Sequence, residues 1–299
     1  MAVTALARRN LRNGLLFASP FIVGLAVFTI YPVVASIYLS FCRYTILRPP
    51  QWVGLDNYGL LFTEDPLFWK SLYNTLYYTA LALPLGLVLA LVLATLLNMK
   101  LRGMALYRTL YFLPTIVPTV AVAILWLWVL NPEYGVLKAG LAVLHVPSPG
   151  WLADPQWSKP GLVVMGLWGV GGTMVIFLAG LAGIPQQFYE AAAIDGAGRW
   201  SQFRHVTLPM ITPTIYFNLV IGLIASFQYF TQVYIMTNGG PTHSTLFYAL
   251  YLYQNAFRYL RMGYASAMAW LLFLVILAAT LFIHRTSARW VYYEGGEAL

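Results

Sequence analysis

Six long apolar segments constrain this chain more than any other feature of its sequence. Each reaches the roughly 20 residues that a helix needs to cross about 30 Å of hydrocarbon. The sequence therefore predicts an all-α integral membrane protein, a single transmembrane domain over residues 1–299 with six transmembrane helices. These helices are expected at about 14–41, 71–97, 109–130, 161–184, 211–236 and 263–283.

Composition agrees with a membrane location. The 299 residues are 60% hydrophobic and 9% charged, whereas a soluble domain carries about 25% charged residues. The single cysteine, Cys42, excludes an intrachain disulfide framework. The net charge of +8 does not indicate nucleic-acid binding, because the basic residues are scattered between apolar segments rather than gathered in a patch.

The N-terminal segment is predicted to be a retained transmembrane helix. Arg8, Arg9 and Arg12 precede an apolar run that far exceeds the 7–15 residues of a signal-peptide core. Pro20 or Pro32 is expected to kink this helix.

Basic residues indicate the orientation of the chain. With six crossings and the N-terminus inside, ten basic residues fall on the cytoplasmic side and seven outside, as the positive-inside rule expects. Both termini and the polar connector 185–209 are then cytoplasmic. The cytoplasmic set is Arg8, Arg9, Arg12, Lys100, Arg102, Arg108, Arg199, Arg204, Arg285 and Arg289, and the outer set is Arg43, Arg48, Lys70, Lys138, Lys159, Arg258 and Arg261.

Helix-breaking residues stand out in the third and fourth apolar segments. Pro114 and Pro118 lie in the third segment, where neighbouring helices must satisfy the freed backbone groups. The fourth segment is rich in glycine, at positions that include Gly166 and Gly169. Small residues there allow close helix packing or an unwound stretch beside a cavity.

The connector between the fourth and fifth segments predicts a helix, a glycine turn and a second helix. Pro185 suits a helix start, and Gly196 suits the left-handed residue that ends a helix. A second short helix is expected over about 199–207, before Pro209.

This connector resembles the EAA loop of ABC-importer permeases. The resemblance implies a cytoplasmic coupling loop that docks on an ATPase subunit, although an ordinary cytosolic connector is the alternative. The residues that carry this role would be Glu190, Ala191, Ala192, Asp195, Gly196, Ala197, Phe203, Leu208 and Pro209.

Further motifs resemble the carbohydrate-importer permeases of the maltose-transporter type. They are Gly239-Gly240-Pro241, Ser244-Thr245 and Asn74-Thr75. The resemblance implies a multi-pass protein of a prokaryotic inner membrane, surrounded by lipid. Its implied partners are a second, related permease, two ATPase subunits and an extracytoplasmic solute-binding protein that delivers a carbohydrate.

The sequence contains no catalytic or metal-binding constellation. Its four histidines lie far apart, and no Gly-Lys dipeptide is present, so a phosphate-binding P-loop is absent. The chain is therefore expected to have no enzymatic activity and no cofactor of its own, with ATP and Mg²⁺ bound by the partner ATPase subunits.

Polar residues in the fifth segment indicate a substrate path. Asn218, Gly222, Ser226, Tyr229 and Gln232 recur at three- or four-residue spacing and are expected to share one helix face, with Gln228 nearby. Polar side chains at membrane depth usually face a bundle interior or a water-filled cavity. The alternative is that they only hold neighbouring helices together.

Other functions remain as alternatives. An importer of another polar solute, such as glycerol phosphate or an amino acid, belongs to the same class, but no lysine or arginine lies within the six segments to attract an anion. A self-sufficient secondary transporter is expected to bury ionisable residues in its segments, and these have none. A membrane-embedded enzyme is disfavoured because His, Asp and Glu do not cluster.

Overall fold

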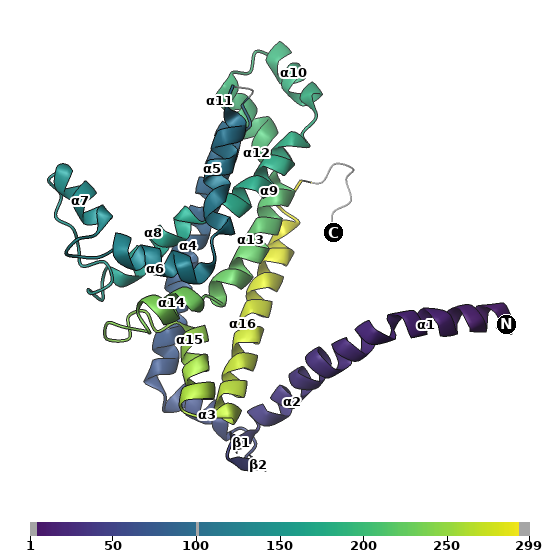
Figure 1. Cartoon of the computed structure of the whole chain (residues 1–299). Coiled ribbons are helices and arrows are strands. Elements are labelled where there is room, and N and C mark those ends of the chain that lie inside the picture. Colours follow the sequence, from purple (N-terminus) through teal and green to yellow (C-terminus); the bar gives the residue numbers. More distant parts are fainter. Residues whose placement is uncertain (1–4, 100–101, 293–299) are drawn as a thin grey trace. The chain divides into compact units, whose positions relative to one another are not determined.

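The computed structural model describes residues 5–99 and 102–292, and most of these residues are helical (Figure 1). Lys100, which contributed to the orientation argument, lies outside the described residues. The helices are α1 (Ala5–Leu25), α2 (Tyr31–Ser40), α3 (Asp56–Thr63), α4 (Pro66–Leu97), α5 (Met104–Ile116), α6 (Thr119–Val129), α7 (Val136–Val143), α8 (Ser158–Trp168), α9 (Gly171–Ala182), α10 (Gln186–Ile194), α11 (Arg199–Gln202), α12 (Leu208–Met210), α13 (Thr212–Phe227), α14 (Thr231–Met236), α15 (Tyr248–Tyr253) and α16 (Met262–Ser287), with π-helical turns η1 (Ala26–Ile30), η2 (Phe203–Thr207) and η3 (Gln254–Arg258).

Among residues 5–99 and 102–292, four helical stretches are long and apolar enough to cross a bilayer. They are Leu6–Ser40, Pro66–Leu97, Thr212–Met236 and Met262–Ser287. Two further pairs, α5 with α6 and α8 with α9, pass the same test together but are bent. The number of spans reaches six if each bent pair crosses once.

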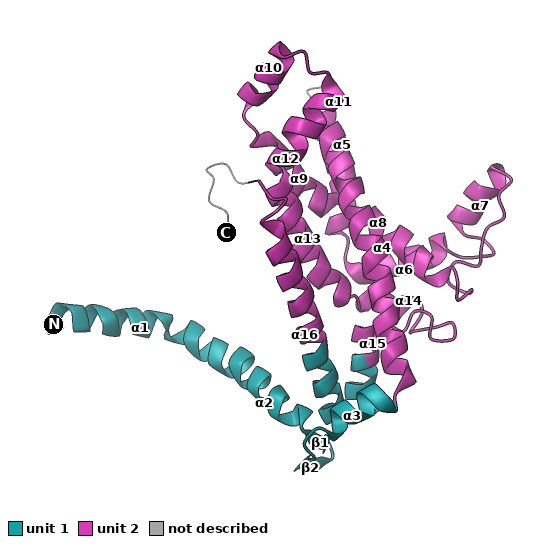
Figure 2. Cartoon of the chain, turned by 180° about the vertical axis from the view of Figure 1, so that it is seen from behind, with its two compact units in different colours: residues 1–64, 252–271 teal, residues 65–251, 272–299 magenta. Residues whose placement is uncertain are grey.

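The chain divides into two compact units (Figure 2). Unit 1 comprises residues 1–64 and 252–271, and unit 2 comprises residues 65–251 and 272–299. The two regions that the sequence analysis singled out for function, the connector 185–209 and the fifth apolar segment, both lie in unit 2.

Unit 1 contains the N-terminal helical stretch and a short hairpin that the sequence analysis did not anticipate. Strands β1 (Cys42–Thr45) and β2 (Arg48–Trp52) pair antiparallel, so a small sheet accompanies the helices. The amide of Asn57 fixes the start of the hairpin by donating to the carbonyls of Ser40 at 2.8 Å and Cys42 at 2.9 Å. Consecutive prolines, Pro49 and Pro50, are tolerated in β2 because edge strands need not donate every N–H.

Proline explains where the π-helical turns η1 and η2 lie. Each turn comes just before a proline, Pro32 or Pro209, which has no backbone N–H and crowds the carbonyl four residues earlier. The helix widens there, and the N–H groups of Tyr31 and Leu208 donate five residues back, to Ala26 and Phe203. The kink expected near Pro32 is thus a π-helical turn.

Helix α4 is the central element of unit 2, packed against α8, α9 and α13. It begins at Pro66, five residues before the apolar segment predicted from Ser71, because Asp65 caps it. The Asp65 carboxylate accepts from the N–H groups of Leu67 at 2.9 Å and Phe68 at 3.2 Å. Its far end packs into a core cluster of Ala90, Ala94, Leu97, Met174, Phe177, Leu181 and Ile211.

The third apolar segment differs from the single helix predicted over 109–130. Helices α5 and α6 meet at an angle of 100°. The cause is Pro118, which disfavours helical geometry at the preceding residue, and Val117 is extended, with φ −70° and ψ 129°. This pair is therefore a sharply broken span or a re-entrant loop.

The fourth apolar segment is also bent, by 46° between α8 and α9. The break falls at Gly169 and Val170, within the glycine-rich stretch for which an unwound helix was one of the two alternatives. Gly171, which follows, approaches the Tyr111 carbonyl of α5 so closely that a Cβ would collide with it. Only glycine allows this contact between α9 and α5.

Candidate functional site

Helices α10 and α11 form a helical hairpin at one end of unit 2 (Figure 1). Pro185 precedes α10 with extended geometry, and Gly196 follows it with φ +77°. The Gly196 N–H donates to the Ala193 carbonyl at 3.1 Å, and the Ala197 N–H donates to the Ala192 carbonyl at 2.9 Å. These two bonds form the Schellman motif that ends many helices. The helix, glycine turn and second helix predicted from the sequence are confirmed.

Side-chain bonds join α10 to η2 and α11 to the glycine turn. The Tyr189 and Thr207 hydroxyls lie 2.9 Å apart, and the Gln202 amide donates to the Ala197 carbonyl at 3.1 Å. From α11 the chain continues through η2 and α12 to Ile211, the N-cap residue of α13. The hairpin and α13 are thus joined by a short stretch of chain that is helical except at Ile211.

The outer face of the hairpin combines acidic and apolar side chains. Glu190 and Asp195 are exposed, and their carboxylates have no hydrogen-bond or ion-pair partner within the described part of the chain. Beside them, Ile194 and Trp200 are 87% and 72% exposed. Exposed apolar residues rimmed by charge mark interaction sites. Sequence reasoning had not included Ile194 or Trp200 in the docking surface.

The remaining residues predicted for coupling divide between the exposed and inner faces. Ala191 and Gly196 are exposed, whereas Ala192 and Ala197 are half-buried. Phe203 is half-buried in η2 and stacks on Trp200 with ring centroids 5.6 Å apart. Leu208 and Pro209 are half-buried in α12, where they join the hairpin to α13.

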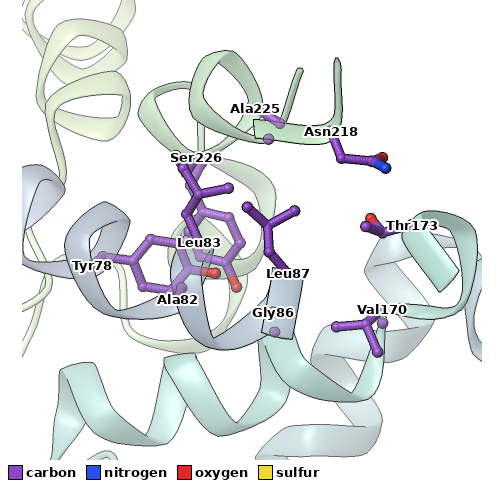
Figure 3. Close-up of a pocket in the computed structure, with 14 residues that line it drawn as sticks. Tyr78, Ala82, Leu83, Gly86, Leu87, Val170, Thr173, Asn218, Ala225 and Ser226 are labelled. Atoms are coloured by element: carbon purple, nitrogen blue, oxygen red, sulfur yellow. The ribbon is translucent and has the colours of Figure 1, made fainter. Parts of the chain in front are cut away.

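Two neighbouring cavities lie between helices of unit 2. The first, of about 220 Å³, lies among α4, α8, α9 and α13, and Figure 3 shows its lining. The second, of about 360 Å³, is lined by residues of α5, α6, α8 and α14. Both cavities are lined by Tyr78, Gly166, Gly169 and Tyr229.

A stacked tyrosine pair forms much of the wall that the cavities share. The Tyr78 and Tyr229 rings have centroids 4.5 Å apart and planes inclined by 27°. A Cβ at Gly166 would come within 3.0 Å of the Tyr78 hydroxyl, so glycine leaves room for the ring. Phe247 packs behind the pair, 5.3 Å from Tyr78 and 5.9 Å from Tyr229.

The polar lining of the first cavity includes Asn218, Ser226 and Thr173. The Asn218 amide donates to the Thr214 carbonyl at 3.1 Å, and the Ser226 hydroxyl donates to the Leu223 carbonyl at 2.9 Å. Both donors therefore bond within α13, while the Asn218 carbonyl oxygen is left to accept. Figure 3 shows the Asn218 amide and the Thr173 side chain facing the same part of the cavity.

The single helical face predicted for the fifth segment is interrupted. Helix α13 ends at Phe227 and α14 begins at Thr231, so the helical spacing holds only as far as Ser226. Tyr229, in the break, still lines both cavities, and Gln232 lines the second. Gln228 is exposed and lines neither.

The sequence analysis missed the cavity residues contributed by other helices, above all Tyr78 and Thr173. It had singled out Gly166 and Gly169, for which close helix packing and an unwound stretch beside a cavity were the two alternatives, and both glycines line both cavities. A tyrosine in a long apolar helix gives no signal of its own, because its partner Tyr229 is 151 residues further along the chain.

Lys159 is also placed differently from the sequence expectation. It was assigned to an outer loop, yet it lies in the first turn of α8 and is 9% exposed. In the described part of the chain, no group of three or more His, Cys, Asp or Glu residues is arranged to hold a metal ion.

Comparison with known proteins gives a consistent result. Residues 82–292 match the family model described as the binding-protein-dependent transport system inner membrane component. The chain is 43% identical to the probable ABC transporter permease protein YesP of Bacillus subtilis, over 97% of this chain and 95% of that protein. It is 36% identical to the lactose transport system permease protein LacF of Rhizobium radiobacter, over 88% and 90% of the two chains.

A solved structure shows the same fold. One chain of a bacterial alginate ABC transporter, in complex with an alginate pentasaccharide-bound periplasmic protein, superposes with a TM-score of 0.83 at 26% identity. The match covers 96% of this chain and 98% of that chain.

Proposed function

Because this chain belongs to the family of binding-protein-dependent transport system inner membrane components, we propose that it forms half of the translocation path of an ATP-driven importer for a sugar or oligosaccharide. A second, related permease supplies the other half. Two ATPase subunits bind and hydrolyse Mg²⁺-ATP, and an extracytoplasmic solute-binding protein delivers the sugar. The assembly lies in a prokaryotic inner membrane, with the α10–α11 hairpin and both termini cytoplasmic.

The observation that carries the proposed substrate class is the chemistry of the two cavities. Their lining combines tyrosine rings with amide and hydroxyl groups, and none of the lining residues is charged. Sugars present hydroxyl groups that exchange hydrogen bonds with amides, and C–H faces that pack on aromatic rings. An uncharged lining favours a neutral polyol over an anion such as glycerol phosphate, which needs a cationic group to offset its desolvation.

The hairpin suggests how ATP hydrolysis reaches this path. The exposed carboxylates of Glu190 and Asp195, with Ile194 and Trp200 beside them, form the surface offered to an ATPase subunit. The hairpin continues into α13, which carries Asn218 and Ser226. Movement of the docked subunit is therefore passed to the wall of the first cavity.

Relatives support the carbohydrate assignment, since they include permeases named for lactose, for trehalose and maltose, and for arabinooligosaccharides. A relative of known structure belongs to a transporter that imports alginate, an acidic polysaccharide. An acidic oligosaccharide is therefore the comparison substrate in the test.

The test is uptake by proteoliposomes that contain this chain, its partner permease and the ATPase subunits, with the solute-binding protein outside. Labelled neutral oligosaccharides, an alginate oligosaccharide and glycerol phosphate are compared at equal concentration. We expect uptake of a neutral sugar that requires both the binding protein and hydrolysable ATP. Uptake of glycerol phosphate alone, or uptake without ATP, would refute the proposal.

A further inference from the structure

Lys159 is a buried lysine at the start of α8, and no acidic partner for it is found among the residues that the structure describes. The Lys159 ammonium donates to the Asn74 side-chain oxygen at 3.3 Å and to the Ser244 carbonyl at 3.2 Å. It also lies 5.2 Å and 5.9 Å from the ring centroids of Tyr77 and Tyr73. These contacts involve acceptors and π faces only, and burying a charge is costly unless its hydrogen bonds are made.

The contacts of Lys159 belong to a larger set of bonds that holds one segment in place. We call residues 238–247, between α14 and α15, the clamped segment. The Asn74 amide donates to the carbonyls of His243 at 2.9 Å and Leu246 at 3.0 Å. The Ser158 and Ser244 hydroxyls lie 2.8 Å apart. Just beyond the segment, the Tyr248 N–H donates to the Thr75 hydroxyl at 2.9 Å.

These bonds are buried and involve three parts of unit 2. Asn74, Thr75, Ser158, Ser244 and Thr245 are each at most 3% exposed. Asn74 and Thr75 belong to α4, and Ser158 and Lys159 begin α8. Asn74-Thr75 and Ser244-Thr245 are two motifs that carried the family resemblance without an assigned role. The structure brings them together at one place. Lys159 is the group that bonds to both.

The clamped segment ends at Phe247, which packs against the tyrosine pair between the cavities. Phe247 is 1% exposed, and its ring lies within 6 Å of the Tyr78 and Tyr229 rings. Tyr78 follows Asn74 by one helical turn on α4, so the clamp and the tyrosine wall share the same stretch of helix. A shift of the segment would move Phe247 and release the stack.

We propose that Lys159 is a positioning residue for transport: it holds the clamped segment against α4 and α8, and thereby keeps Tyr78 and Tyr229 stacked between the two cavities. This inference rests on the proposed import function and adds a residue that does not itself line either cavity. The clamp stays closed while substrate moves, because opening it would leave a buried ammonium and several buried polar groups without partners. Lys159 therefore affects transport indirectly, by keeping the tyrosine wall of the proposed substrate path in place.

The first test replaces Lys159 by methionine, which keeps the length of the side chain and removes the ammonium. The matched control is Lys138→Met, because Lys138 is exposed and donates to the Glu133 carbonyl at 3.0 Å. In the reconstituted importer, we expect Lys159→Met to lower sugar uptake per ATP hydrolysed by about tenfold or more, because both hydrogen bonds from a charged donor are lost. Lys138→Met should match the wild type.

The second test restores the clamp without the lysine. Ser158→Cys with Ser244→Cys places two thiols where the hydroxyls are 2.8 Å apart, so a disulfide is expected on mild oxidation. Added to Lys159→Met, the disulfide should return uptake per ATP to near the wild-type value, and reduction should remove the rescue. A lysine needed for its charge alone would not be replaced by a disulfide.

The outcomes separate this proposal from the proposed function. If the wild-type importer takes up no sugar, the proposed function fails, whereas disulfide formation in the membrane-embedded chain still reports whether the clamp exists. Wild-type coupling in Lys159→Met would overturn the proposal. The triple variant, which combines Lys159→Met with Ser158→Cys and Ser244→Cys, would also overturn the proposal if it crosslinks but stays uncoupled, or if it fails to assemble. If the disulfide reversibly blocks transport in the double-cysteine variant that keeps the native Lys159, the clamped segment must instead open during transport.

Discussion

Replacing Gly196 by alanine isolates the contribution of one backbone angle to coupling. Gly196 has φ +77°, and a Cβ built there meets no atom within 4 Å. Gly198, two residues further, also has open space around a built Cβ, but its φ is −70°. Alanine at either position therefore adds no contact, and only position 196 opposes the preferred backbone geometry.

The magnitude follows from the cost of left-handed geometry. An L-residue in that region costs roughly 1–2 kcal/mol relative to glycine, which corresponds to a factor of about 5–30 in the population of the native turn. The Schellman bonds from Gly196 and Ala197 compete against this cost, each contributing about 0.5–1.5 kcal/mol. Gly196→Ala should therefore weaken the turn substantially without unfolding α10. Gly196→Asn should have a smaller effect, because asparagine tolerates this conformation better.

The assay is retention of the ATPase subunits during purification of the complex, together with sugar uptake per ATP hydrolysed. We expect Gly196→Ala to lower at least one of these severalfold, Gly196→Asn to lie between, and Gly198→Ala to match the wild type. All three variants should insert normally, because none lies in an apolar segment. Equal behaviour of Gly196→Ala and Gly198→Ala would refute the argument that this turn positions a docking helix.

Three further predictions concern energy, topology and substrate contact. The purified chain alone should hydrolyse no ATP, because it has no P-loop to hold phosphates; hydrolysis that survives removal of every partner would contradict this. In intact cells, an impermeant thiol reagent should label cysteines introduced at Asp56 and Asp154 but not one introduced at Trp200. Native Cys42 is 0% exposed and should stay unlabelled. Labelling at position 200 but not at positions 56 and 154 would overturn the orientation. Asn218→Leu and Gln232→Leu should reduce sugar uptake severalfold to about tenfold, as expected for one lost hydrogen bond. Gln228 lines neither cavity, so Gln228→Leu should leave uptake unchanged. Equal transport kinetics in all three variants would mean that Asn218 and Gln232 only hold helices together.

Features encoded by neighbouring residues were predictable from the sequence. The α10 hairpin depends on Pro185 at its start and Gly196 at its turn, and both act through the local backbone. The unwound stretch of the fourth segment follows from its glycines. The long apolar runs likewise indicated a membrane protein without any knowledge of packing.

Features that depend on contacts between distant residues were not predictable. The bend of 100° between α5 and α6 needed Pro118 to be recognised as a break rather than a tolerated proline. Lys159 read as an outer-loop residue because its partners, Asn74 and Ser244, lie 85 residues away in each direction. The spacing that placed Gln232 with Asn218 assumed an unbroken helix through 228–230.

The central claim is that the cavities walled by Tyr78 and Tyr229 form the substrate path, and protection of a cysteine at Thr173 tests it most directly. Thr173 lines the first cavity, whereas Thr95, also half-buried in unit 2, does not. In the reconstituted importer, reaction of a small maleimide with Thr173→Cys is measured with and without sugar-loaded binding protein and ATP. The account predicts that transported sugar slows labelling at position 173 severalfold and leaves Thr95→Cys unchanged. Equal labelling rates at position 173 with and without sugar would contradict it.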